Sequence, residues 1–293
     1  MSKIKISILC PTAKRPKELR NMITSALNQS SNPKEIEFCL YLDRGDDSYN
    51  KLMNNFSRIN VKIIRGPKMW LSTMYNCLLV ISSGNIIMWG GDDVVFLTPK
   101  WDQKVISKFN SLSDSLRMVF VNDLTNGAGI WANIGFVHKS WIDFFGYLFT
   151  PHMPDNGIDS WITSVTKKLN RAHYLNDVVI EHRQYRQGKS DIDSTYLQRL
   201  EKHKMYNPLF LYKSLDEEKR RDLLMLSVKA DNRYVPFDYK FIFSFIFLKI
   251  IMLFKFFPVR DETLIYLGAM KNWSFLKLVL RKIGIPLGPK SWY

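Results

Sequence analysis

Cysteine is scarce in this sequence, and its scarcity excludes two kinds of protein. The 293 residues include three cysteines, Cys10, Cys39 and Cys77, which lie far apart in apolar stretches. No pair has the spacing of a zinc site, and an odd number of cysteines argues against a disulfide framework. We therefore expect buried free thiols in a reducing cytoplasm.

Targeting signals and repeats are also missing. The apolar run at residues 4–9 is far too short for a signal peptide, and no small-residue cleavage site follows it. The chain contains no internal repeat and no low-complexity tract, and apolar residues make up 46% of it. This composition supplies a sizeable core and excludes global disorder. We expect a chain that stays inside the cell.

Acidic residues are few relative to basic ones. Asp and Glu number 27 against 42 Lys and Arg, which gives a formal net charge of +15. A charge of this sign requires an anionic partner, such as nucleic acid, a phosphorylated substrate or an acidic membrane surface. Because the positive charge is dispersed and no nucleic-acid-binding motif is present, we expect no nucleic acid partner.

The N-terminal part of the chain alternates between strand and helix patterns. In chain order, the patterns are strand 4–9, helix 17–27, strands 36–42 and 61–64, helix 71–79 and strand 85–89. This alternation predicts an α/β fold, a Rossmann-like, mostly parallel sheet flanked by helices. Ligands bind at the carboxyl ends of the strands in such sheets. Those ends carry Pro11 and Thr12, Asp43, Gly66 and residues 90–93.

The last of these ends, in the stretch MWGGDDVVF, carries two adjacent carboxylates. Asp92 and Asp93 follow two glycines and lie between two apolar runs. Carboxylate oxygens suit Mg²⁺ or Mn²⁺, which binds one or two carboxylates together with substrate phosphates. The alternative is a solvated turn, since Gly-Gly-Asp-Asp is favourable turn chemistry. The strand-end position favours the metal site.

The same region resembles a known family. Residues 71–96, with Asn76, Gly84, an apolar strand and then the two aspartates, are similar to the signature of family 2 glycosyltransferases of the GT-A fold. The opening ISILCPTAKRP resembles that family's first strand, and Asp43 resembles its nucleobase-binding aspartate. The resemblance implies a divalent cation as cofactor. The implied nucleotide-sugar-binding residues are Pro11, Thr12, Arg15, Asp43, Asn76, Asp92, Arg183 and Arg186.

A second family pattern follows downstream, so the resemblance covers roughly residues 4–186. It includes Asp159, the strand patterns near 172–175 and 178–180, and then His182. By resemblance, Asp159 is the catalytic base and His182 joins Asp92 and Asp93 as a metal ligand. A helix N-cap is the alternative for Asp159, and a histidine satisfied at a strand end is the alternative for His182.

Two residues depart from the family's pattern, and one expected motif is missing. Gly90 replaces the first aspartate of the usual Asp-x-Asp, and Ile158 replaces a usual glutamate. By resemblance, loss of this first carboxylate predicts weaker ribose binding, weaker metal binding, or both. The chain also lacks the Gln-x-x-Arg-Trp of processive polysaccharide synthases, which favours an enzyme that adds a single sugar.

The composition changes near Tyr196. Helical patterns continue from there, and the segment 237–293 is basic, aromatic-rich and amphipathic. We therefore expect a GT-A domain at residues 1–195 and a helical, membrane-associating extension at residues 196–293, lying in the plane of the membrane. A true membrane span and a buried helical core or oligomer interface are the alternatives.

These observations predict an inverting, metal-dependent glycosyltransferase of surface polysaccharide biosynthesis. Its partners would be a nucleotide diphosphate-sugar donor, a glycan or lipid-linked acceptor and the anionic inner face of the cell membrane. A sugar nucleotidyltransferase is the first alternative, although only Arg15, Pro16 and Lys17 resemble its phosphate loop and the glycines are missing. A non-catalytic, basic nucleic-acid-binding protein is the second.

Overall fold

The computed structural model describes residues 5–183, 188, 197 and 215–231. Its strands are β1 (Ile6–Thr12), β2 (Ile36–Asp43), β3 (Val61–Gly66), β4 (Ile86–Trp89), β5 (Val94–Phe96), β6 (Met118–Asn122), β7 (Gly135–His138) and β8 (Ala172–His182). Its helices are α1 (Pro16–Asn28), α2 (Asn50–Asn55), α3 (Leu71–Leu78), α4 (Trp101–Asn110), α5 (Lys139–Phe145), α6 (Ile158–Lys168) and α9 (Asp216–Asp231), with short 3₁₀ turns at Pro33–Glu35 and Asp47–Tyr49.

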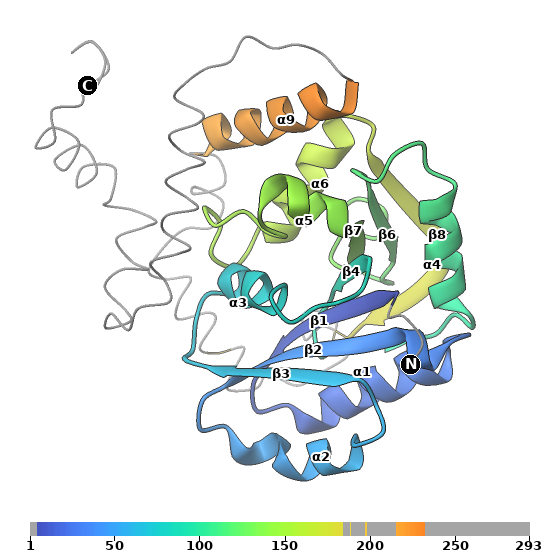
Figure 1. Cartoon of the computed structure of the whole chain (residues 1–293), viewed down its shortest axis with the longest axis vertical. Coiled ribbons are helices and arrows are strands. Elements are labelled where there is room, and N and C mark those ends of the chain that lie inside the picture. Colours follow the sequence, from blue (N-terminus) through green and yellow to red (C-terminus); the bar gives the residue numbers. More distant parts are fainter. Residues whose placement is uncertain (1–4, 184–187, 189–196, 198–214, 232–293) are drawn as a thin grey trace, which may run out of the picture. The chain divides into compact units, whose positions relative to one another are not determined.

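The strands form one sheet in the order β3-β2-β1-β4-β7-β6-β8-β5 (Figure 1). The first four are mutually parallel, which confirms the Rossmann-like half that the alternating pattern predicts. The second half is mixed, because β7 runs antiparallel to both β4 and β6, and β5 runs antiparallel to β8. The two short strand patterns near 172–180 are one strand, β8, interrupted by a bulge.

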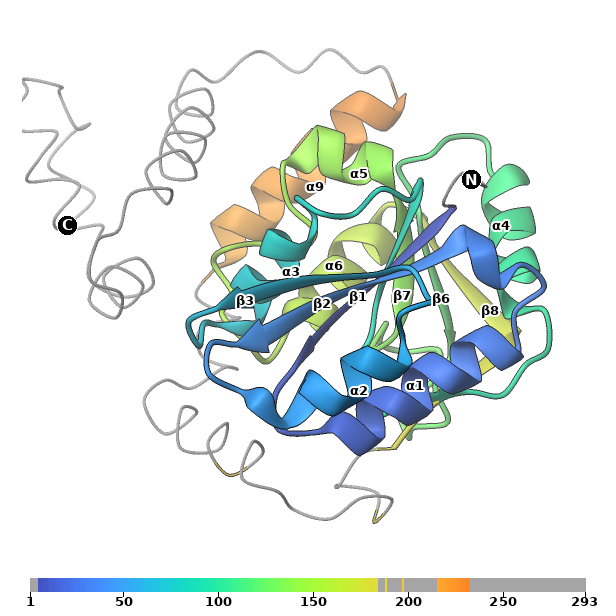
Figure 2. The same ribbon diagram turned by 60° about the horizontal axis from the view of Figure 1, so that its bottom comes forward.

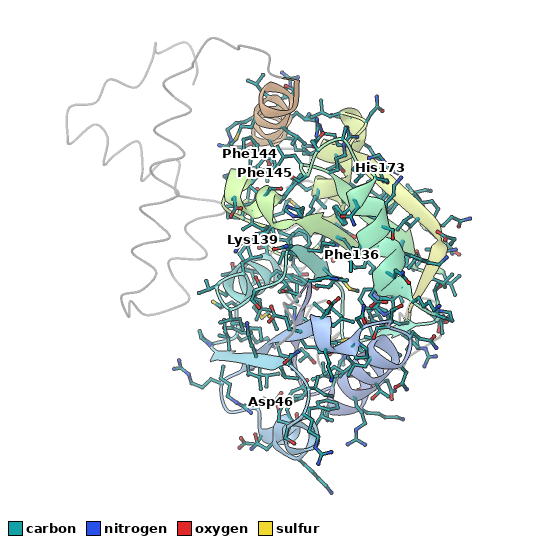
Figure 3. All side chains as sticks on the ribbon, turned by 45° about the vertical axis from the view of Figure 1, so that its right-hand side comes forward. Asp46, Phe136, Lys139, Phe144, Phe145 and His173 are labelled. Carbon is teal, nitrogen blue, oxygen red and sulfur yellow. The ribbon has the colours of Figure 1, made fainter. Side chains whose placement is uncertain are left out.

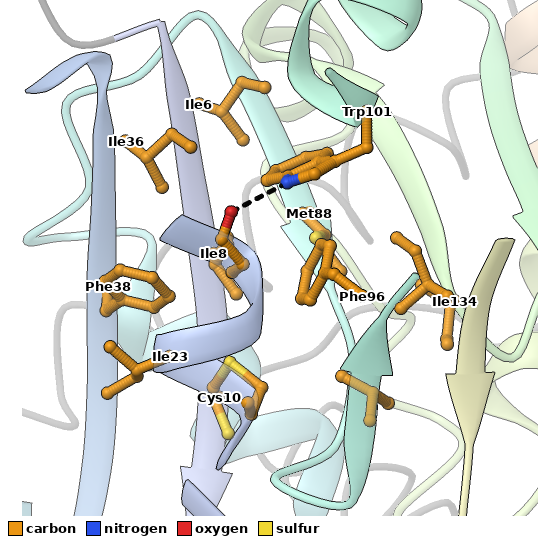
Figure 4. Packing of buried hydrophobic residues seen from close by; sticks show 14 of the residues in the cluster. Ile6, Ile8, Cys10, Ile23, Ile36, Phe38, Met88, Phe96, Trp101 and Ile134 are labelled. Atoms are coloured by element: carbon orange, nitrogen blue, oxygen red, sulfur yellow. Dashed lines mark hydrogen bonds between the residues drawn. The ribbon is translucent and has the colours of Figure 1, made fainter. Parts of the chain in front are cut away.

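Helices cover both faces of this sheet (Figure 2). Helices α1, α2 and α4 contribute to one apolar cluster, and α3, α5, α6 and α9 contribute to the other. Alternate residues of each strand supply the two clusters, so that Ile8 enters the first and Leu9 enters the second. In the first cluster the buried Trp101 packs beside Phe96 and donates its indole N–H to the carbonyl of Ala26, at 2.9 Å (Figure 4).

The amino-terminal edge of the sheet buries a carboxylate. Glu37 is 1% exposed and accepts hydrogen bonds from the hydroxyl of Ser7 at 2.5 Å and from the N–H and hydroxyl of Ser83 at 2.5 and 2.8 Å. The Lys62 ammonium lies 2.9 Å from it. Burial by itself raises the pKa of Glu37, but these bonds outweigh burial and lower it. The glycine-bearing turn is required here, because a Cβ on Gly84 would lie 2.7 Å from the nitrogen of Ser7.

Replacing Glu37 by alanine is expected to destabilise the fold by about 3–5 kcal/mol, because the buried donors around it would lose their acceptor. Since the folded pKa is lowered, the contribution of Glu37 is complete above about pH 5 and is lost as pH falls below the ordinary value. Urea unfolding at pH 7 measures the loss. Asp143→Ala, at an exposed position on α5, is the control, and equal losses in the two variants would contradict this account.

The helical pattern expected beyond Tyr196 is present in part as α9, which packs against α6. The buried Asp222 of α9 accepts hydrogen bonds from the Tyr147 hydroxyl at 2.9 Å and from the Trp161 indole at 2.8 Å. Thus α9 lies beyond the domain boundary predicted at residue 195 yet packs on the unit that precedes it. The described helices include none with the length and apolar character needed to cross a membrane. The segment 237–293 lies outside the described residues.

Candidate functional site

The two adjacent aspartates occupy the turn between β4 and β5. Asp92 is buried, with 5% of its surface exposed, so a fully solvated turn is wrong for this residue. The Tyr75 hydroxyl donates to the carbonyl of Gly90 at 3.0 Å and fixes the start of the turn. A Cβ on Gly91 would lie 2.3 Å from an oxygen of Asp93, which explains the glycine. The turn therefore directs Asp92 into the protein.

The carboxyl end of β1 reaches the same turn. The Thr12 hydroxyl donates to Asp92 Oδ2 at 2.5 Å and lies 2.7 Å from the hydroxyl of the buried Tyr49. The Tyr49 hydroxyl also accepts the backbone N–H of Arg15 at 2.9 Å. Tyr49 thus connects the end of β1, with the predicted Pro11 and Thr12, to the start of α1.

Arg15 brings a positive charge to the pair of aspartates. Its Nη1 lies 3.1 Å from Asp92 Oδ1 and 3.9 Å from Asp93 Oδ2. Pro16 begins α1 directly after it, because proline is preorganised for the first helical position. One guanidinium nitrogen therefore lies within ion-pairing distance of both carboxylates.

The strand β8 supplies the predicted histidine. His182 Nε2 lies 3.3 Å from Asp93 Oδ1, and the N–H of Arg183 donates to the carbonyl of Asp93 at 2.8 Å. Val94 pairs with His182 in the antiparallel ladder between β5 and β8. The structure therefore brings His182 to the acidic turn through backbone pairing, as the sequence pattern implied.

Burial and charge shift the pKa values of these groups in different directions. Burial, assisted by the charge of Asp93, raises the pKa of Asp92 to about 7, against the lowering effects of Arg15 and Thr12. Burial would also raise the pKa of Asp93, but the hydrogen bond and charge of His182 and the charge of Arg15 lower it. Burial would lower the pKa of His182, but Asp93 raises it, with smaller contributions from Asp123 and Asp159. At neutral pH, therefore, Asp93 is ionised, whereas Asp92, with a pKa of about 7, is divided between its protonated and ionised forms.

Asp159, the predicted base, is the second residue of α6. The N-cap of this helix is Gly157, whose φ of 93° suits glycine, so the alternative of Asp159 as the N-cap is wrong. Asp159 Oδ1 accepts the N–H of Ser160 at 2.8 Å. The charge of Asp159 contributes to the raised pKa of His182, after the larger effects of Asp93 and Asp123.

Asp123 is a member of this region that the sequence motifs missed. It is buried and follows β6 directly, and its carboxylate accepts hydrogen bonds from Thr125 and from the amide of Asn133 at 2.7 Å. Its backbone carbonyl accepts the N–H of His182 at 3.0 Å. The strand-end rule that selected Asp43 would have found it, had the end of β6 been included.

Two other predicted residues, Asn76 and Asp43, lie on neighbouring elements. The side chain of Asn76 holds the loop after α5, since its oxygen accepts the N–H groups of Leu148 and Phe149. Asp43 ends β2, where the preceding Leu42 pairs with Thr12 of β1. Asp46, in the loop that follows (Figure 3), accepts the backbone N–H of Lys14 at 2.9 Å.

Residues near the end of β8 and two tryptophans complete the set. The Arg183 guanidinium donates to Glu181 at 3.0 Å, and Arg186 lies outside the described residues. Trp161 is buried in the core, whereas Trp131 is 42% exposed.

The acidic turn suits a divalent cation that also binds substrate phosphates. Across the described residues, no three His, Cys, Asp or Glu side chains converge to hold a metal ion. Mg²⁺ and Mn²⁺ commonly take one or two carboxylates from the protein and the remaining oxygens from phosphates and water. The Arg15 nitrogen between Asp92 and Asp93 already places a positive charge there, so the two carboxylates fit such an ion.

Comparison with known proteins places this site in context. Residues 7–146 match the profile of the family described as Glycosyl transferase family 2. TarS of S. aureus matches with a TM-score of 0.50 and 14% identity, over 60% of this chain and 36% of the TarS chain. TarS 1–349 in complex with UDP matches with a TM-score of 0.50 and 10% identity, over 80% and 94%.

A third solved structure is PcManGT from Pyrobaculum calidifontis, a mannosyltransferase in complex with GDP-Man and Mn²⁺. It matches with a TM-score of 0.49 and 9% identity, over 97% of this chain and 88% of its own. This chain spans about a third of the longer TarS structure. No curated protein matches the chain significantly. At these identities the likeness to TarS shows the fold.

Proposed function

We propose that the donor is a nucleoside diphosphate-sugar and that the acceptor is a glycan hydroxyl. This proposal refines the match of the chain to family 2 glycosyltransferases of the GT-A fold. The observation that carries this proposal is the junction of three strand ends at one buried acidic turn. Thr12 from β1, Asp92 and Asp93 after β4, and His182 from β8 are joined there by direct contacts. This is the edge of the sheet at which α/β folds bind ligands.

Donor binding is assigned to the parallel half of the sheet. Thr12 and Arg15 follow β1, where the N-terminus of α1 favours an anionic group. Asp43 at the end of β2 is proposed to bind the nucleobase, by resemblance to the family. The diphosphate would then lie between Arg15 and the acidic turn, where the guanidinium supplies positive charge.

The acidic turn is proposed to hold Mg²⁺ or Mn²⁺ through Asp92 and Asp93, with His182 as a further ligand. Such an ion neutralises the charge that develops on the leaving diphosphate. The protein contributes the orientation of the two carboxylates, since Thr12 and Tyr75 fix the turn. His182 and Arg183 hold Asp93 from the other side.

Asp159 is proposed to deprotonate the acceptor hydroxyl, on the face of the sugar opposite the leaving group, which gives inversion. Two observations support it. The charge of Asp159 contributes to the raised pKa of His182, the residue that contacts Asp93. It is also fixed on the first turn of α6, whose following residues Trp161 and Ile162 are buried in the core. A base held on a rigid helix keeps its oxygen in a constant place.

A donor panel tests the proposal directly. In calorimetric titrations with UDP-, GDP- and TDP-sugars, we expect one class to bind in the presence of Mn²⁺ and to be hydrolysed slowly without acceptor. Pyrophosphate release from a nucleoside triphosphate and a sugar phosphate would instead indicate a nucleotidyltransferase. Salt-sensitive binding to oligonucleotides, with no response to any nucleotide-sugar, would indicate a nucleic-acid-binding protein.

The acceptor is proposed to be lipid-linked, in surface polysaccharide biosynthesis on the inner face of the cell membrane. The support is the basic, aromatic composition of residues 237–293, which suits attraction to anionic lipid. Sedimentation of the chain with anionic vesicles, but not with neutral ones, is the expected result. Equal recovery in the supernatant with both vesicles would contradict it.

A further inference from the structure

Every carboxylate oxygen of the acidic pair already has a partner within the protein. Asp92 Oδ1 lies 3.1 Å from Arg15 Nη1, and Asp92 Oδ2 accepts the Thr12 hydroxyl. Asp93 Oδ1 lies 3.3 Å from His182 Nε2, and Asp93 Oδ2 lies 3.9 Å from the same Arg15 nitrogen. The guanidinium therefore occupies the position between the carboxylates.

A divalent ion between the two carboxylates competes with Arg15 for the same oxygens. Mg²⁺ binds carboxylate oxygens at about 2.0–2.1 Å. Because the Arg15 nitrogen lies 3.1 Å from Asp92 Oδ1 and 3.9 Å from Asp93 Oδ2, an ion bound to both carboxylates would overlap the space of the guanidinium. The two positive charges would also repel each other strongly in a site shielded from water. One cation has to leave as the other enters.

Arg15 is the partner that can move. Thr12 is part of β1 and is hydrogen-bonded to the buried Tyr49, and His182 is part of the β8 ladder. The side chain of Arg15 is 20% exposed and long, whereas its backbone N–H is fixed to Tyr49 at the start of α1. The guanidinium can therefore leave the carboxylates while its Cα stays in place.

We propose that Arg15 is the resident counter-ion of the acidic pair, which a divalent cation displaces and which then binds the diphosphate of the donor. This inference rests on the proposed function. The planar guanidinium donates two parallel hydrogen bonds to phosphate oxygens, and the N-terminus of α1 favours the same anion. Binding of the metal and binding of the diphosphate are thereby coupled. The metal replaces the guanidinium as the positive charge at the carboxylates, and the diphosphate replaces the carboxylates as the anionic partner of the guanidinium. Metal without diphosphate leaves the guanidinium without its carboxylates and binds weakly.

Mn²⁺ binding to the full chain tests this coupling without any need for turnover. Free Mn²⁺ is measured by electron paramagnetic resonance for the wild type, Arg15→Gln and Arg20→Gln, first with Mn²⁺ alone. Pyrophosphate binding is then measured by calorimetry with and without Mn²⁺. Arg20 is an exposed residue of the same helix and carries the same charge, so its variant controls for the loss of one positive charge.

We expect Arg15→Gln to bind Mn²⁺ alone about 10-fold more tightly than the wild type, and to lose about 10-fold of the coupling between Mn²⁺ and pyrophosphate. Arg20→Gln is expected to match the wild type in both measurements. Arg15→Lys keeps the charge and the stability of the turn, and is expected to keep the weak binding of Mn²⁺ alone. Circular dichroism verifies that each variant is folded.

Two results would overturn the inference, and they differ in what they say of the proposed function. Unchanged Mn²⁺ affinity in folded Arg15→Gln, with pyrophosphate still bound in the presence of Mn²⁺, would remove the counter-ion role and leave donor binding intact. Absence of any diphosphate binding by the wild type, at any Mn²⁺ concentration, would overturn both.

Discussion

Replacing Asp159 by asparagine is expected to lower kcat for sugar transfer by about 10²–10⁴-fold while leaving donor affinity unchanged. Asparagine has nearly the shape of aspartate and can still accept the N–H of Ser160 at the start of α6. It cannot take a proton from the acceptor hydroxyl. The change therefore removes the basic group and retains the local structure of the helix.

Two measurements separate this role from a structural one. Single-turnover transfer reports the chemical step, and calorimetric titration with the donor and Mn²⁺ reports binding. Asp155→Asn is the matched comparison, since Asp155 is a buried aspartate of the loop that precedes α6. Loss of turnover in Asp155→Asn together with near-normal transfer in Asp159→Asn would reassign the base to Asp155.

Replacing Asp92 by asparagine is expected to weaken Mn²⁺-dependent donor binding by about 100-fold or more, because a direct ligand exceeds the 10–100-fold effect of a residue that only supports one. The amide keeps an oxygen that can accept from Thr12 but carries no charge for the metal. Asp177→Asn, far along β8 and well exposed, is the control with the same chemical change. Donor affinity in Mn²⁺ equal to that of the wild type would exclude Asp92 from the metal site.

The same variant is expected to unfold at a higher temperature than the wild type at pH 8 in metal-free buffer. Burial and Asp93 raise the folded pKa of Asp92 to about 7, above its unfolded value near 4, so the folded state binds the proton more tightly. Stability therefore falls as pH rises from about 4 to about 7, and asparagine removes that dependence. Calorimetric unfolding across this pH range measures it, and a melting temperature below that of the wild type at pH 8 would contradict it.

The sequence predicts the first half of the fold better than the second, for a physical reason. Parallel strands buried on both faces, such as β1 and β2, are continuous apolar runs separated by amphipathic helices, and both are visible as patterns. The later strands β5 and β7 have three and four residues. Strands this short carry too few residues to show a clear periodicity, and the alternation of side chains does not depend on the direction of a strand. The antiparallel pairs of the second half were therefore missed.

The sequence also predicts one part of the candidate site better than the rest. Strand ends identify Thr12, Asp92 and Asp93, because the carboxyl ends of parallel strands converge. Resemblance to the family adds His182, which the structure brings to Asp93. The partnership of Arg15 with both carboxylates depends on the rotamer of a long side chain at the start of α1, and that conformation has no signature in the sequence. The bond from the Trp161 indole to Asp222 of α9 also has no signature in the sequence, because the two residues lie far apart along the chain.

The bulge of β8 has a consequence for how this protein can change in evolution. Val121 of β6 pairs with Leu175 and its neighbour Asn122 pairs with Val179, so residues 176–178 have no partners on β6. This insertion sets which residue of β8 lies opposite Val94. If residues 172–175 keep their pairing with β6, deletion of one residue in this insertion would place Arg183 opposite Val94 instead of His182. Surface loops tolerate changes in length, whereas the length of β8 determines which side chain, and therefore which charge, lies beside Asp93.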